Sequence, residues 1–242
     1  MDEAGTANNL ASEGAVGANK AGITSRVTTN DDLTITGLVG QATVGLEGEE
    51  SAKRIVELVN NKFDNTGVSA TATTTIKIEV NSGDAPGDHV VGFNLYGKNT
   101  DAQTISATIS VGSTTATSDL SNLRDAINAY SANTGIRATL SADKTNIIIV
   151  QDEGEDVVIE DVDFATVTNG NTKFTFTAMS QDQTDEAATQ ITTVTDTQHG
   201  ASTDSVRFTG QITFHSSQTF TISATAGQGL FEAAPGTATL NK

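Results

Sequence analysis

The stretch INAYSANTGIRATL, residues 127–140, decides the fold because it contains the end of a helix, a stop and the start of a strand. Gly135 predicts a left-handed stop, since glycine adopts that conformation without steric cost. Ile136 then begins an alternating strand. The helix is predicted to begin near Ser118, a good N-cap residue. Its apolar side recurs at helical spacing, at Leu120, Leu123, Ile127 and Tyr130.

Nearly the same sequence occurs upstream as VNNKFDNTGVSATA, residues 59–72. The helix predicted before it carries Glu49 and Glu50 near its N-terminus, where acidic side chains are favoured, and Gly67 as its stop. Its apolar side is predicted to contain Ala52, Val56, Val59 and Phe63. The strands QATVGL and SATISVG before the two helices also correspond. The chain therefore uses one strand-helix-strand-strand module twice, with identities at Asn60/Asn128, Asn65/Asn133, Thr66/Thr134, Gly67/Gly135, Ala70/Ala138 and Thr71/Thr139.

The rest of the chain favours strands. Threonine is abundant, and its branched Cβ suits a pleated surface. NIIIV, residues 146–150, is typical of a strand buried on both faces or crossing a core. From about residue 170, KFTFTAM, DSVRFTGQITF and QTFTISATA alternate as antiparallel strands. The predicted fold class is α+β, mainly β: two small modules and an antiparallel strand-rich segment.

Turn residues cluster in NSGDAPGD, residues 81–88, which gives the best internal boundary. The head of the chain is rich in Ala, Gly, Asn and Ser without a sustained period, which is typical of a linker. The predicted division is a linker (1–31), a first module (32–88), a second module (89–167), an antiparallel β segment (168–236) and an exit tail (237–242).

The formal net charge is −17, from 13 basic and 30 acidic residues. Such a surface repels phosphate backbones and anionic lipid, so neither nucleic acid nor a membrane is an expected partner. Cysteine is absent, which excludes disulfides and thiolate metal sites. No apolar run reaches membrane-spanning length, and the acidic N-terminus does not resemble a signal peptide.

Motifs for catalysis are missing from the sequence. His89, His199 and His215 have no partner at metal-ligand spacing, and HExxH, GxSxG, P-loop and dinucleotide patterns do not occur. The glycines of GLVGQATVG, residues 37–45, predict a hairpin turn. We therefore predict no catalytic, cofactor-binding or metal-binding residue and no enzymatic activity.

The acidic run QDEGEDVVIEDVDF, residues 151–164, is the strongest candidate for ion binding. Asp152, Glu153, Glu155 and Asp156 flank Gly154 in a predicted hairpin. Calcium requires six to eight converging oxygens, and the run lacks the spacing of a calcium loop. A charged turn between two strands is the favoured interpretation, and calcium binding by residues 151–163 stays open. A paired-carboxylate glycosidase is less favoured, because Trp is absent and cannot hold a sugar ring.

The repeated unit is similar to a known family. DAINAYSANTGIRATLSADKTNIIIV resembles the Ile-Asn motif of bacterial flagellins and hook-associated proteins, and ELVNNKFDNTGVSATA resembles a diverged copy of it. GQITFHSSQTFTISATAGQGLF is similar to the closing strands of flagellin central regions. The resemblance covers roughly residues 32–232.

The resemblance implies the outer, variable portion of a flagellin subunit, a structural and extracellular part of the filament that serves motility and presents an antigenic or adhesive surface. In that family, helical ends pack into the filament core. This sequence contains neither end, so it is interpreted as a fragment, monomeric in isolation. The expected partners are neighbouring flagellin subunits, bound through those terminal helices, with contacts between outer domains in addition. The second module would be a distal domain inserted into a proximal one, and head and tail would lie near each other.

Three alternatives stay open. A hook-associated or filament-cap protein would share the motif. An adhesin or glycan-binding module would need an exposed aromatic cluster, but the alternation of the candidate residues favours the core: Phe174, Phe176, Phe208, Phe214 and Phe220. An enzyme can occur in this family as an inserted zinc protease, whose HExxH motif is absent here.

Overall fold

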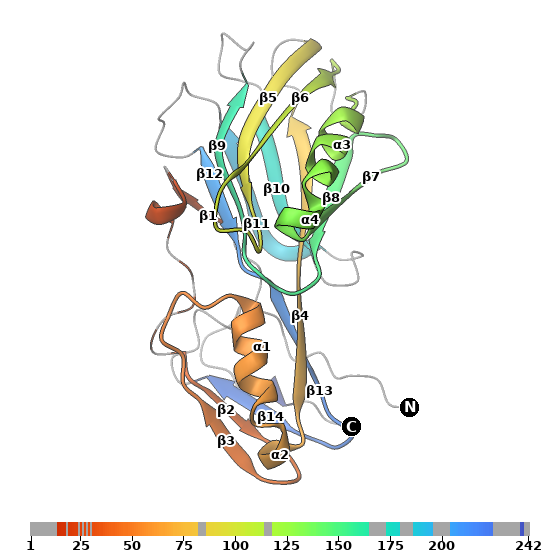
Figure 1. Cartoon of the computed structure of the whole chain (residues 1–242). Coiled ribbons are helices and arrows are strands. Elements are labelled where there is room, and N and C mark those ends of the chain that lie inside the picture. Colours follow the sequence, from red (N-terminus) through yellow and green to blue (C-terminus); the bar gives the residue numbers. More distant parts are fainter. Residues whose placement is uncertain are drawn as a thin grey trace.

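The computed structural model describes residues 14–17, 19–23, 25, 27, 29, 31–81, 86–113, 118–164, 173–179, 186–195, 204–224 and 238–239. These residues form an elongated molecule with a larger and a smaller lobe, joined along one long strand (Figure 1). Antiparallel strands dominate and helices are few, so the predicted α+β, mainly β class is confirmed.

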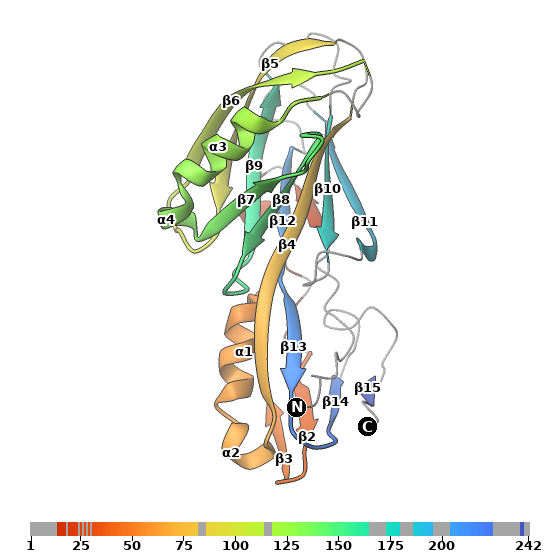
Figure 2. The ribbon, with the colours of Figure 1, turned by 90° about the vertical axis from the view of Figure 1, so that its right-hand side faces the viewer.

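The larger lobe contains two facing antiparallel sheets (Figure 2). One has the order β1 (Gly14–Gly17), β12 (Ser205–Phe208), β9 (Val157–Phe164), β5 (Gly87–Tyr96) and β6 (Gln103–Val111). The other has the order β11 (Glu186–Thr195), β10 (Lys173–Met179), β4 (Ser69–Asn81), β8 (Asn146–Gln151) and β7 (Ile136–Leu140).

The core of the larger lobe is formed by the two sheets together with the helix α3 (Ser121–Ala129). The short α4 (Ser131–Thr134) follows α3. Leu123 and Ile127 of α3 are buried in it. Phenylalanine rings fill the centre, with Phe174 4.8 Å from Phe164 and 5.8 Å from Phe176 between ring centroids. This aromatic cluster stabilises the sheet pair through burial and tilted ring contacts.

The smaller lobe contains a four-stranded sheet of order β15 (Ala238–Thr239), β14 (Thr221–Ala224), β2 (Leu33–Thr36) and β3 (Gln41–Val44). The helix α1 (Ala52–Asn60) and the short α2 (Phe63–Thr66) lead into β4, and β13 (Gln211–His215) pairs with the first part of β4. A second core links these elements, made by apolar residues that include Ile35, Ile55, Val59, Ile212, Phe214 and Ile222.

Strand β4 belongs to both lobes. Ser69–Thr73 pair with β13, whereas Thr74–Glu79 pair with β8. Ala72 therefore lies in the core of the smaller lobe and Ile76 in the core of the larger one. The predicted boundary at 81–88 lies beyond this change, and residues 82–85 lie outside the described part of the chain.

The closing segment also differs from the prediction. DSVRFTGQITF was expected as one alternating strand, but Thr209 and Gly210 separate β12 from β13. β12 pairs with β9 in the larger lobe, and β13 pairs with β4 in the smaller one. The strand ends here because the chain crosses from one lobe to the other.

The two long helices begin and pack slightly differently from the sequence prediction. In α1 the N-cap is Ser51, and the buried residues are Ala52, Ile55 and Val59. Phe63, expected on this apolar side, is 49% exposed. In the second module the helix begins at Ser121 rather than near Ser118, and the Asp119 carboxylate accepts from the Ser121 backbone N–H at 2.9 Å.

Three further expectations from the sequence differ from the structure. The expected linker contains strand β1 and the 3₁₀ turn η1 (Lys20–Gly22), and the expected exit tail contains β15. β1 lies in a sheet of the larger lobe and β15 in the smaller lobe, so these described parts of head and tail are not neighbours. β8 alternates between buried and partly buried residues and is not buried on both faces.

Candidate functional site

The two modules share side-chain hydrogen bonds that fix each helix to the strand after it. In the second module, Asn128 Nδ2 donates to the Ala138 carbonyl at 2.9 Å, and Asn128 Oδ1 accepts from the Ala138 N–H at 2.8 Å. In the first module, Asn60 makes the same two bonds with Ala70, at 3.0 and 2.8 Å. One asparagine amide thus satisfies both backbone groups of one strand residue, which explains why Asn and not Asp occupies both positions.

The threonine of the repeated Asn-Thr-Gly is a second shared element. Thr134 Oγ1 donates to the Tyr130 carbonyl at 3.0 Å and accepts from the Ile136 N–H at 3.1 Å. Thr66 makes the corresponding bonds in the first module, at 3.0 and 3.2 Å. Both threonines are fully buried. The glycines that follow have φ of 70° at Gly67 and 71° at Gly135, so both predicted left-handed stops are confirmed.

A strand-end glycine lies against each of these threonines. A Cβ on Gly37 would overlap the Thr66 carbonyl, and one on Gly97 would overlap the Thr134 carbonyl. Leu33 and Phe93 lie at the same sequence distance before Gly37 and Gly97, and they pair with Val44 and Ile105, respectively. Val44 and Ile105 are therefore equivalent positions. The strand QATV therefore corresponds to AQTI and not to SATI, a correction of the sequence alignment. The predicted hairpin turn at residues 37–40 is confirmed, with Gly37 N–H donating to the Gly40 carbonyl at 2.9 Å.

The loop at residues 152–156, named here the junction loop, joins β8 to β9 in the larger lobe and contacts the start of α1 in the smaller lobe. The Lys53 backbone N–H donates to the Gly154 carbonyl at 2.8 Å. Gly154 has φ of 75°, and a Cβ there would overlap the Ala72 side chain. A side chain is therefore excluded at this contact between the junction loop and the smaller lobe.

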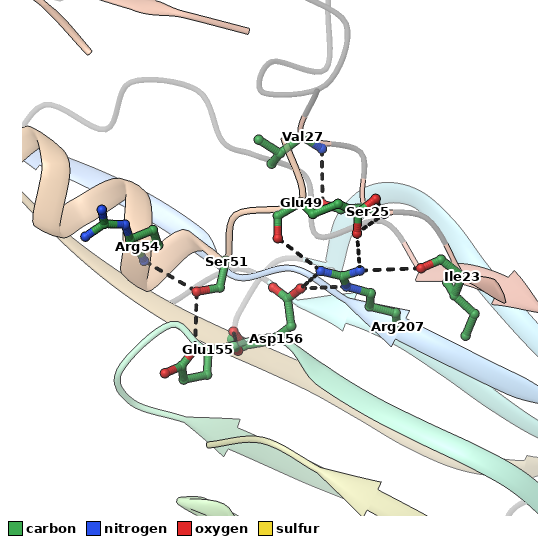
Figure 3. A network of polar contacts seen from close by, with 10 residues as sticks. Ile23, Ser25, Val27, Glu49, Ser51, Arg54, Glu155, Asp156 and Arg207 are labelled. Carbon is green, nitrogen blue, oxygen red and sulfur yellow. Dashed lines mark hydrogen bonds and ion pairs between the residues drawn. The ribbon is translucent and has the colours of Figure 1, made fainter. Parts of the chain in front are cut away.

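Acidic side chains of the junction loop pair across the lobes. Lys53 Nζ lies 2.6 Å from Glu153 Oε2 and 3.1 Å from Glu155 Oε1. Hydrogen bonds to Glu153 and Glu155 raise the pKa of Lys53 to about 12, and the bond from Lys53 lowers the pKa of Glu153. Ser51, the N-cap of α1, also donates to Glu155 at 3.2 Å (Figure 3).

Arg207 of β12 is the centre of a second set of contacts at the same junction (Figure 3). Its Nε donates to Asp156 Oδ2 at 2.6 Å, and its Nη1 donates to Glu49 Oε2 at 2.7 Å. The side chains of Arg207 and Asp156 are only 15% and 12% exposed. Burial raises the pKa of Asp156 to about 6 although Arg207 opposes this. Burial disfavours the charged guanidinium too, but Asp156 and Glu49 outweigh it and raise the pKa of Arg207.

Glu49, predicted as a favourable charge at a helix N-terminus, instead organises the connection between the lobes. Its carboxylate accepts from the Ser25 N–H at 3.1 Å, and its own N–H donates to the Val27 carbonyl at 2.9 Å. Its φ is 66°, which is uncommon for a residue with a side chain and is held by these contacts.

A cavity of about 720 Å³ adjoins this network. On its larger-lobe side, Tyr96 Oη donates to Glu160 at 2.8 Å, and Lys20 Nζ lies 4.1 Å from the centre of the Tyr96 ring. Burial and the Glu160 hydrogen bond raise the pKa of Tyr96 to about 12. The carboxylates around the cavity are already bonded within the chain: Glu49 and Asp156 to Arg207, Glu155 to Ser51, and Glu160 to Tyr96.

The acidic run is therefore a junction and not the predicted hairpin. β8 and β9, which flank it, belong to different sheets. Its carboxylates are divided among three basic residues: Glu153 and Glu155 pair with Lys53, Asp156 pairs with Arg207, and Asp152 pairs with Arg137. Among the described residues, no group of three or more His, Cys, Asp or Glu side chains is placed to hold a metal ion.

The other sequence candidates lie apart from one another. His215 Nε2 lies 3.0 Å from Thr71 Oγ1 on the strand surface, His89 is buried, and His199 lies outside the described residues. The phenylalanines considered as a glycan platform are all buried: Phe174, Phe176, Phe208, Phe214 and Phe220. In the described part of the chain, no helix has the length and apolar character needed to cross a membrane.

The pairing of Arg207 with Asp156 was not predicted from the sequence. The available signal was weak: Arg207 is a single basic residue between Val206 and Phe208, both of which are in the core. Nothing in the local pattern linked it to an acidic residue 51 positions away.

Comparison with known families matches residues 92–153 to the flagellin hook IN motif, over about a quarter of the chain. No curated protein matches the chain. The matched segment contains the second half of β5 together with β6, α3, α4, β7 and β8, and thus Asn128, Thr134 and Gly135. The resemblance to the flagellin Ile-Asn motif that was predicted from the sequence is confirmed for this segment, which matches the motif found in flagellin-type proteins.

Proposed function

We propose that the chain forms the outer, surface-exposed domains of a bacterial flagellar filament subunit, with a role in motility and in presenting the filament surface. The observation that carries this proposal is the duplicated motif. The matched segment uses Asn128 and Thr134 to fix its helix, and the first module repeats the same bonds with Asn60 and Thr66. Two structural copies of one flagellar motif favour a flagellar protein over an adhesin that shares one motif by chance.

The domain organisation that fits this role is nested. The smaller lobe would be the proximal domain, because it combines the first module with β13 and β14 from the closing segment in one core. The larger lobe would be the distal domain, entered along β4 near residue 73 and left at Thr209–Gly210. The proposed boundaries differ from the sequence-based ones, and β1 and β12 would belong to the distal domain.

The proposed work of the chain is structural and not catalytic. Its partners would be neighbouring flagellin subunits of the filament. The net charge of −17 suits a hydrated surface on an extracellular filament. The polar junction around Arg207 supports the role, because paired charges between two lobes hold a projecting domain in one orientation.

Immunogold electron microscopy tests the proposal. Antibodies raised against the purified chain are applied to intact cells of the bacterium that encodes it. We expect gold particles along the full length of the flagellar filament. Label confined to the hook junction or the filament tip would assign the chain to a hook-associated or cap protein, which shares the motif. Label on the cell surface without filaments would contradict the flagellar assignment.

A further inference from the structure

Gln151, the last residue of β8, lies inside the larger lobe directly before the junction loop. Its side chain is buried, with the whole residue only 1% exposed. The side-chain oxygen Oε1 accepts the backbone N–H groups of Glu153 and Glu155, both at 2.9 Å. One buried amide oxygen therefore fixes the two residues on either side of Gly154.

The residues that Gln151 holds are the ones that contact the smaller lobe. The Gly154 carbonyl accepts the backbone N–H of Lys53 at 2.8 Å. The carboxylates of Glu153 and Glu155 lie 2.6 and 3.1 Å from Lys53 Nζ. The junction loop is thus bound from one side by a buried amide of the larger lobe and from the other side by the start of α1.

The smaller lobe contains a counterpart of Gln151. Strand β13 pairs with β4 in the register in which β8 pairs with β7. The equivalent pairs are Ala70 with Phe214 and Ala138 with Ile149. The residues two positions after Phe214 and Ile149 are Ser216 and Gln151, so these two are equivalent.

Ser216 makes only part of these contacts. Its Oγ donates to the Gly67 carbonyl at 3.0 Å and accepts the Gln218 N–H at 3.2 Å. Gln151 also lies against the glycine stop of its module, because a Cβ on Gly135 would be 3.3 Å from its Nε2. Only the longer glutamine holds two amides of the loop that follows. The loop after Ser216 lies at the end of the smaller lobe that faces away from the larger one (Figure 2).

The glutamine has a cost within the larger lobe. Among the described residues, Gln151 Nε2 has no hydrogen-bond partner although it is buried. A buried donor without a partner is destabilising, and an apolar side chain of similar length would avoid this penalty. The stability of the larger lobe alone therefore does not explain a glutamine here, whereas the two bonds to the junction loop do.

We propose that Gln151 is a positioning residue that sets the orientation of the two lobes, by holding the junction loop against α1 from inside the larger lobe. Without its two bonds, the loop stays attached to β8 and β9 but no longer presents Gly154 to Lys53. The contact of Arg207 with Glu49 remains, so the lobes stay associated and pivot about β4. The inference concerns this chain alone and does not depend on the flagellar assignment.

A distance measurement between the lobes tests the proposal. The chain contains no cysteine, so spin labels on Thr43→Cys of β3 and Ser106→Cys of β6, both exposed, report one distance by double electron–electron resonance. We expect a narrow distribution with Gln151 present and one about twofold broader in Gln151→Met. The amides of Glu153 and Glu155 should exchange roughly tenfold faster in this variant, while those of β7 and β8 keep their protection.

Ser216→Ala is the matched control, because it removes the bonds of the counterpart and should leave the distance distribution unchanged. Gln151→Ser, which carries the residue of the smaller lobe, replaces Gln151→Met if circular dichroism shows that the latter is unfolded, and should broaden the distribution equally. An unchanged distribution in a folded Gln151 variant overturns the proposal, as does equal broadening in Ser216→Ala. Fast exchange of the Glu153 and Glu155 amides in the wild-type chain overturns it without any variant.

Discussion

Asn128 and Ala138 form a closed pair, in which the asparagine amide both donates to and accepts from the backbone of the alanine. The pair joins α3 to β7 across the left-handed stop at Gly135. Asn60 and Ala70 form the same pair in the smaller lobe. Because each lobe has its own copy, the contribution of the pair can be measured twice in one chain.

Asn128→Ala should destabilise the larger lobe by about 1–3 kcal/mol, because the backbone N–H and C=O of Ala138 lose their partners in a partly buried position. Asn60→Ala should have a similar cost in the smaller lobe. Native-state hydrogen exchange assigns each effect to its lobe, and urea unfolding gives its size. Asn133→Ala is the control, since Asn133 makes one exposed bond of 3.3 Å to Gln103. Equal losses in Asn128→Ala and Asn133→Ala would contradict the assigned role.

Gly154→Ala should loosen the junction between the lobes. The new methyl group overlaps Ala72, and φ of 75° is unfavourable for alanine, so the loop must move away from α1. We expect the hydrogen bond from Lys53 to Gly154 to be lost while both cores remain intact. Small-angle X-ray scattering should then show a wider distribution of lobe orientations. Gly92→Ala is the control, because its nearest contact would be an ordinary 3.7 Å. An unchanged scattering profile for Gly154→Ala would argue against this role of the glycine.

Local sequence was enough to predict the modules. The Asn-Thr-Gly stops are determined by residues within one helical turn, so Gly67 and Gly135 were identified correctly. The apolar spacing of Leu120, Leu123 and Ile127 likewise reports a single helix face, and all three are buried. Tyr130 and Phe63 were placed on the same faces, but each lies at the helix end beyond the core and is exposed.

Pairing between distant segments was not predictable in the same way. The sequence of β4 contains two separate strand-like runs, VSATA and TIKIEV, yet β4 is one continuous strand, and its two halves pair with different partners. The reverse holds for DSVRFTGQITF, whose alternation continues past Thr209–Gly210 although the strand does not. The alternation of apolar and polar residues shows which side of a strand is buried, but it does not show which sheet that strand belongs to. The junction at Arg207 and Asp156 depends on this missing information, so it could not be derived from one sequence.

Arg207→Met should destabilise the chain by about 3–5 kcal/mol, because it leaves the buried Asp156 carboxylate without its cation. The double variant D156N/R207M should recover part of this loss, since no buried charge remains. Urea unfolding of the wild-type chain, both single variants and the double variant gives the coupling free energy. Arg137→Met is the control, because Arg137 pairs with Asp152 on the exposed side of the same loop and should cost less than about 1 kcal/mol. A double variant that is less stable than Arg207→Met would exclude an unpaired charge as the cause.

The stability of the junction should depend on pH with opposite signs at Asp156 and Glu153. The folded-state pKa of Asp156, about 6, lies above its ordinary value of 3.8, so the native state holds this proton more tightly than the unfolded state does. Its contribution to stability is present in full below the ordinary pKa and is lost as the pH rises through about 6. The pKa of Glu153 is lowered by Lys53, so its contribution is present above 4.5 and is lost as the pH falls.

Between pH 4 and pH 7, the free energy of unfolding of the wild-type chain should therefore fall relative to that of Asp156→Asn, by up to about 3 kcal/mol. Relative to Glu153→Gln it should rise over acidic pH, by a small amount because the ion pair is exposed to solvent. Urea unfolding of the three proteins at one-unit pH steps measures both differences. A difference that rises with pH for Asp156→Asn would mean that the attraction of Arg207 exceeds the cost of burying the carboxylate, and the junction would then be most stable at neutral pH.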